Sequence, residues 1–69
     1  MAEPSADDAD ARLAKLVHDL RSPLTVAEGF AQLLARDTGA LTPEQRADFA
    51  GRVAAAMADM RGLLDATRD

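Results

Sequence analysis

The sequence predicts an all-α fold, an antiparallel helical hairpin that dimerises into a four-helix bundle. Alanine accounts for 16 of the 69 residues, and β-branched and aromatic residues are few, which is typical of helices. Apolar residues recur every three or four positions in two long segments that a short polar stretch separates. A chain this short buries little by itself and has no cysteine for a disulfide, so we expect a second copy to supply the missing burial.

The first predicted helix spans about residues 8–36 and follows an acidic tail, residues 1–6, that we expect to be disordered. Its apolar residues are separated alternately by four and three positions, as in the a/d pattern of helical bundles. This stripe consists of Leu13, Val17, Leu20, Leu24, Ala27, Ala31 and Leu34. His18 and Ser22 fall on the opposite, polar face, so we expect the imidazole to point into solvent.

A loop at residues 37–42 separates the two predicted helices, so that residues 7–69 form one domain. Gly39 suits a helix C-cap position. Thr42, Pro43 and Gln45 form a strong start signal, with threonine as the N-cap, proline as the first helical residue and glutamine at the third.

The second predicted helix runs from residue 43 to about 66. Its apolar stripe consists of Ala50, Val53, Met57, Met60 and Leu64. Gly51 and Gly62 each cost about 1 kcal/mol relative to alanine inside a helix. We therefore expect these glycines to permit close approach of a neighbouring helix.

Composition excludes several classes of function. A net charge of −4 argues against a nucleic-acid partner. No apolar run approaches the roughly 20 residues needed to span a bilayer, and the acidic N-terminus is unlike a signal peptide, so we expect a cytoplasmic location. One histidine and no cysteine predict no metal site, and the absence of a glycine-rich phosphate loop predicts that this chain binds no ATP.

The stretch "VHDLRSPLT", residues 17–25, holds the only histidine, His18, followed directly by Asp19. Neutral imidazole is a nucleophile, and a carboxylate that bonds one ring nitrogen leaves the other free to attack. Pro23 has no N–H, so the Asp19 carbonyl loses its usual partner and we expect the helix to loosen there. The residues alone leave a second interpretation open, a solvated surface pair beside a tolerated proline. A serine nucleophile at Ser22 lacks an orienting group.

The longer run "LVHDLRSPLTVAEGFAQLL", residues 16–34, resembles the H-box of the sensor histidine kinase family. That family's dimerisation and histidine phosphotransfer domain carries a His-Glu/Asp-Leu-Arg-Thr/Ser-Pro-Leu motif. A Gly-Tyr/Phe pair and two leucines follow about ten residues later. Residues 18–24 match the motif, and Gly29, Phe30, Leu33 and Leu34 match the later positions. The resemblance covers nearly the whole chain, because the hairpin and its length also match.

The resemblance implies a role for each residue of the motif. His18 would accept the γ-phosphoryl group of ATP on a ring nitrogen, with Asp19 as general base and orienter. Arg21 would assist with the phosphate charge, unless it is only a solvated arginine. Ser22 stands where the family often has a threonine or asparagine that positions water for dephosphorylation of the regulator. Pro23 would be a hinge.

The resemblance also implies partners. The phosphoryl group would pass to an aspartate on a response-regulator receiver domain, docked around residues 26–35 and 43–53. The family's ATP-binding catalytic domain is not in this sequence, so ATP and Mg²⁺ would act through a catalytic domain in trans, and we expect no self-phosphorylation. Whether the chain is an excised domain or a standalone protein stays open, although its initial methionine and polar lead-in favour a natural start.

Two other hypotheses remain at this stage. The chain would instead be a non-catalytic dimeric hairpin, an adaptor or decoy for a kinase or regulator, or a fragment that only dimerises. The intact His18 and Asp19 favour phosphotransfer over a decoy.

Overall fold

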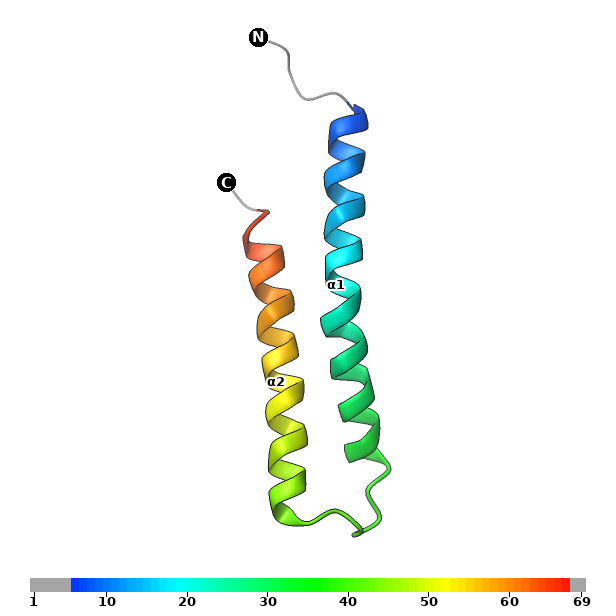
Figure 1. Cartoon of the computed structure of the whole chain (residues 1–69), viewed down its shortest axis with the longest axis vertical. Helices are drawn as coiled ribbons and strands as arrows, with labels where there is room; N and C mark the ends of the chain where they lie inside the picture. The colour runs from blue at the N-terminus through cyan, green and yellow to red at the C-terminus, as the bar shows by residue number, and fades with distance from the viewer. Residues whose placement is uncertain (1–5, 68–69) are drawn as a thin grey trace.

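The computed structural model describes residues 6–67 and consists there of two antiparallel helices, α1 (Ala6–Ala35) and α2 (Pro43–Asp65), which lie side by side (Figure 1). The predicted all-α hairpin is confirmed. The prediction placed the first helix at 8–36 and the second at 43–66. Residues 1–5 of the predicted tail lie outside the described residues. Within residues 6–67, neither helix is long and apolar enough to cross a membrane.

Helix α1 continues through Pro23 without a break. Proline removes one backbone hydrogen bond, the one that the Asp19 carbonyl would accept. The Pro23 ring is half-buried on the side of α1 that faces α2, and helical turns flank it in both directions. The predicted loosening therefore does not interrupt the helix. Pro23 deprives the Asp19 carbonyl, one turn earlier, of its usual N–H donor.

The start of α2 is fixed by a reciprocal pair of hydrogen bonds. The Gln45 backbone N–H donates to Thr42 Oγ1 at 3.0 Å, and the Thr42 backbone N–H donates to Gln45 Oε1 at 2.9 Å. Pro43 is the first helical residue, where its missing N–H costs nothing. The predicted start signal is confirmed in full.

The two helices contact each other along a narrow stripe. Among the described residues only Ala27 and Ala56 are buried, with 8% and 4% of their surface exposed. The Phe30 and Phe49 rings pack beside them, with centroids 5.2 Å apart and a tilt of 49°. The other half-buried apolar residues of the two helices are Leu16, Leu20, Pro23, Leu34, Val53, Met60 and Leu63. The hairpin therefore has a thin core with alanines at its centre.

The expectation for Gly51 and Gly62 is wrong within the hairpin. Both are exposed, and no neighbouring atom lies within 4 Å of a Cβ placed on either residue. They lie five residues before and six after Ala56, so the 100° turn per residue carries both away from α1. Alanine, and not glycine, occupies the close contact between the helices.

Asp37 organises the loop. Its Oδ1 accepts hydrogen bonds from the backbone N–H groups of Gly39 at 2.9 Å and Leu41 at 3.3 Å. Its Oδ2 forms an ion pair with Arg46 Nε at 3.2 Å, and only 9% of the Asp37 side chain is exposed. The Gly39 hydrogen bond lowers the pKa of Asp37. The Leu41 hydrogen bond and the Arg46 charge lower it further, against partial desolvation that raises it.

Gly39 has a φ of 97°, a conformation that side-chain-bearing residues rarely adopt. It serves the turn around Asp37, and not the helix C-cap that the sequence suggested, because α1 already ends at Ala35. Asp37 and Arg46 thus join the loop to the first turn of α2, and we call the contacts of Asp37 with Gly39, Leu41 and Arg46 the Asp37 clamp.

Candidate functional site

His18 projects from the side of α1 that faces away from α2. It lies nine residues, or two and a half turns, before the buried Ala27, so the two side chains point in opposite directions. The residue is exposed, as the sequence predicts, and its ring takes part in no hydrogen bond or ion pair with the described residues. The His18 side chain is therefore accessible to an approaching reactant.

The surface around His18 is a shallow, open depression formed by α1 alone. Its lining residues are Asp10, Leu13, Ala14, Val17, His18 and Arg21. Arg21 follows His18 by three positions and so lies next to it on the same face of the helix. Among residues 6–67, no other segment of the hairpin encloses this depression. The depression is therefore open to solvent along its length on α1.

Asp19 is directed elsewhere. Its Oδ2 accepts a hydrogen bond from Lys15 Nζ at 2.6 Å, and the two residues form an ion pair one helical turn apart. The Asp19 side chain is 30% exposed, whereas that of Lys15 is 75% exposed. The structure therefore brings Asp19 to Lys15 and not to His18. The sequence interpretation overlooked Lys15, although a lysine four residues from an aspartate is a recognisable helical pair.

Ser22 lies one turn after His18 but lines a different feature, a groove between the helices. The groove also contains Pro23, Val26, Phe30, Arg52, Ala55, Ala56 and Asp59. The Arg52 guanidinium carbon lies 5.4 Å from the centre of the Phe30 ring, and Arg52 Nε pairs with Asp48 Oδ2 at 3.0 Å. The groove thus has an apolar floor and a charged rim, and it begins one turn from the histidine.

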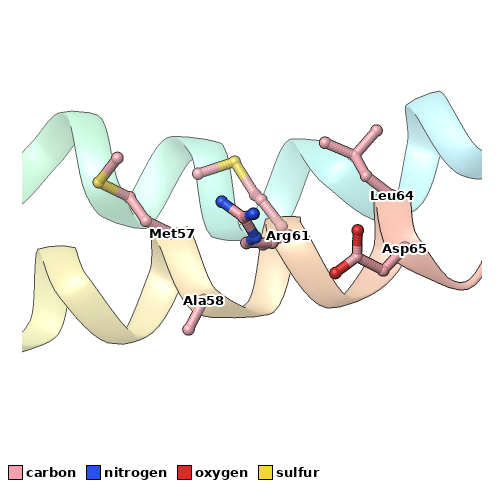
Figure 2. Close-up of a pocket in the computed structure, with 6 residues that line it drawn as sticks. Met57, Ala58, Arg61, Leu64 and Asp65 are labelled. Carbon is pink, nitrogen blue, oxygen red and sulfur yellow. The ribbon is translucent and has the colours of Figure 1, made fainter.

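The other side of the hairpin is apolar. Five large side chains there are between 44% and 60% exposed: Leu13, Val17, Leu24, Met57 and Leu64. Figure 2 shows Met57 and Leu64 directed to the same side of α2, while Ala58 points away. Val26 of α1 and Arg52 of α2 line the groove on one side of the hairpin. The five exposed apolar side chains therefore lie on the flanks of α1 and α2 that face away from the groove. We call this set the apolar face.

Comparison with known proteins identifies one family. The family model for the His Kinase A (phospho-acceptor) domain matches residues 10–69, which includes the whole motif from His18 to Leu24. No curated protein and no solved structure gives a match. The matched segment spans both helices and the loop. The chain therefore belongs to the His Kinase A (phospho-acceptor) domain family, which supports a phosphoacceptor role in two-component signalling.

Proposed function

We propose that this chain accepts a phosphoryl group on His18 from ATP bound to a separate catalytic domain and passes it to an aspartate of a response regulator. The observation that carries this proposal is the exposed His18 ring, unpaired within residues 6–67, on the open face of a phosphoacceptor-family domain. A decoy would need neither the free ring nor the aspartate beside it.

The phosphorylation step uses two groups of this chain. The unprotonated ring nitrogen of His18 attacks the γ-phosphorus, so a nitrogen–phosphorus bond forms. The bond from phosphorus to the oxygen that bridges the β- and γ-phosphates breaks, and ADP leaves with that electron pair. The proton on the other ring nitrogen passes to the Asp19 carboxylate and then to water. Arg21, on the same face, offsets the charge of the phosphoryl oxygens. ATP and Mg²⁺ belong to the catalytic domain in this scheme.

The groove beside His18 is the docking site for the receiver domain in this proposal. Its residues Val26, Phe30 and Arg52 fall within the two segments, 26–35 and 43–53, around which the resemblance to the family implies docking. Ser22 lies at the rim nearest His18, where it can hold the water for dephosphorylation of the regulator. Pro23 lines the same groove, and the Asp19 carbonyl, which lacks its usual N–H donor, is the hinge of this segment in the proposal.

We also propose that two hairpins associate into a four-helix bundle through the apolar face. A hairpin in which only Ala27 and Ala56 are buried leaves most of its apolar surface in contact with water. Pairing two apolar faces removes ten half-exposed side chains from water at once. Because its proposed partners and ATP act in the cytoplasm, we propose the same location for this chain.

The test is incubation of the chain with a histidine kinase catalytic domain, γ-labelled ATP and a receiver domain. We expect acid-labile label on the wild type, transfer of that label to the receiver, and no label on His18→Gln. Asp7→Asn, which changes a charge in the first turn of α1 outside both the groove and the depression, leaves His18 intact and serves as the folding and labelling control. Equal label on wild type and His18→Gln would refute the proposal. Absence of label from both, with receiver binding retained, would favour an adaptor.

A further inference from the structure

Lys15 is the only lysine in the chain, and its ammonium holds the carboxylate that the proposed reaction needs. Lys15 Nζ lies 2.6 Å from Asp19 Oδ2. The lysine side chain is 75% exposed, so water surrounds most of it and its long stem is free to reorient. An exposed ion pair of this kind is weak, and so its partners exchange easily.

Lys15 has a second neighbour on the helix. It precedes His18 by three residues, and residues three apart lie next to each other on a helix surface. The His18 ring has no partner among residues 6–67, and both side chains are exposed, so the lysine ammonium can reach toward the ring. Arg21 occupies the corresponding position three residues after His18. Two cationic side chains therefore flank the histidine, and one of them is engaged by Asp19.

We propose that Lys15 is a positioning residue that changes partners when His18 is phosphorylated. It pairs with Asp19 while the ring is unmodified and moves to the phosphoryl group as that group reaches the ring, which frees the Asp19 carboxylate to accept the ring proton. The phosphoryl group carries close to two negative charges, against one on Asp19, so it attracts the ammonium more strongly. The phosphoryl group on His18 also lies close to the negatively charged Asp19 carboxylate. The nearby Lys15 ammonium offsets the repulsion between these two anionic groups. This inference rests on the proposed function for the identity of the modified residue.

A single lysine makes the first test direct, because a ¹⁵Nζ-lysine spectrum contains one side-chain signal. Phosphoramidate phosphorylates exposed imidazole chemically, so no kinase is needed. Before modification, we expect Asp19→Asn to shift the Lys15 signal. The matched control Asp48→Asn, which breaks an ion pair between Asp48 and Arg52 with the same four-residue spacing, should leave the signal unchanged. After modification, the wild-type signal should move, and the difference between wild type and Asp19→Asn should fall by at least half.

The second test measures the phosphorylated fraction of His18 by ³¹P spectroscopy at a fixed phosphoramidate concentration. We expect Lys15→Met to lower the ratio of modified to unmodified protein about twofold, the usual size for an exposed helical ion pair. Lys15→Arg should restore the ratio. Arg12→Met removes a positive charge from α1 nearly two turns before His18, and it should match the wild type.

The inference is overturned if the Lys15 signal does not move on phosphorylation, or if the difference in that signal between wild type and Asp19→Asn persists afterwards. It is also overturned if Lys15→Met and Arg12→Met give equal ratios of modified to unmodified protein. These results are separable from failure of the proposed function. If phosphoramidate modifies His18 and moves the lysine signal, but no kinase labels the chain, the proposed function fails alone. If phosphoramidate cannot modify His18, both fail, because the ring is then not accessible.

Discussion

Replacing Leu24 with alanine is expected to weaken self-association, whereas the same change at Leu33 is not. The two leucines are 45% and 47% exposed, and both lie in α1. They are nine residues apart, so they point to opposite sides of the helix. Leu24 belongs to the apolar face, and Leu33 lies on the side of the groove. The two variants therefore remove the same side chain, at the same exposure, from opposite surfaces.

The magnitude follows from the exposure. Burying a whole leucine side chain contributes about 1.5–3 kcal/mol. With 45% of Leu24 still exposed in the hairpin, association buries a remainder worth about 1 kcal/mol per chain. Both subunits lose it, so Leu24→Ala should weaken the dimer by about 2 kcal/mol, or about thirtyfold in the dissociation constant. Leu33→Ala should change that constant by less than about threefold.

Sedimentation equilibrium over a dilution series measures both dissociation constants, and circular dichroism verifies that each variant is helical. The comparison is sharp because the two substitutions have the same intrinsic effect on helix propensity. The proposed interface is wrong if Leu33→Ala weakens association as much as Leu24→Ala does. A wild-type chain that sediments as a folded monomer at every concentration would refute the dimer altogether.

Two further predictions concern the loop. Asp37→Asn should lower the melting temperature at neutral pH. Because folding lowers the pKa of Asp37, its contribution is present above the ordinary aspartate value of about 3.9 and is lost as the pH falls through the lowered value. Melting curves of wild type and Asp37→Asn should therefore converge in strong acid, while a pH-independent gap would contradict the clamp. Thr42→Ala should cost about 1 kcal/mol in urea unfolding by removing the N-cap. Thr38→Ala, in the same loop but without a cap role, should cost less than about 0.5 kcal/mol, and equal losses would argue against the cap.

Apolar periodicity predicts both helices well but does not say which side of each stripe faces the other helix. In α1 the stripe divides. Leu20, Ala27 and Leu34 pack against α2, whereas Leu13, Val17 and Leu24 stay exposed. A stripe this wide indicates contact with more than one neighbour. The width of the stripe does not say which of its residues contact which neighbour. Only the structure separates the residues that pack against α2 from those of the apolar face.

The Asp37 clamp was missed for a different reason. The sequence places a loop at residues 37–42 and notes Gly39, but it assigns that glycine to the helix end. An aspartate two residues before a glycine is a known turn signal and could have indicated the hydrogen bond between them. The ion pair with Arg46 could not be found in this way, because it joins the loop to a helix whose direction is set by packing. Local chemistry predicts half of the clamp, and tertiary structure supplies the other half.

The position of Asp19 shows how helix geometry constrains the proposed chemistry. Adjacent residues on a helix diverge by 100°, whereas residues four apart lie on one face. Asp19 is therefore better aligned with Lys15 than with His18, its neighbour in the motif. To accept the imidazole proton, its carboxylate must leave the better-aligned partner, and Pro23 withholds an N–H from the backbone carbonyl of this same residue. The identity of the base follows from the motif, but its availability depends on an ion pair that lies outside the motif.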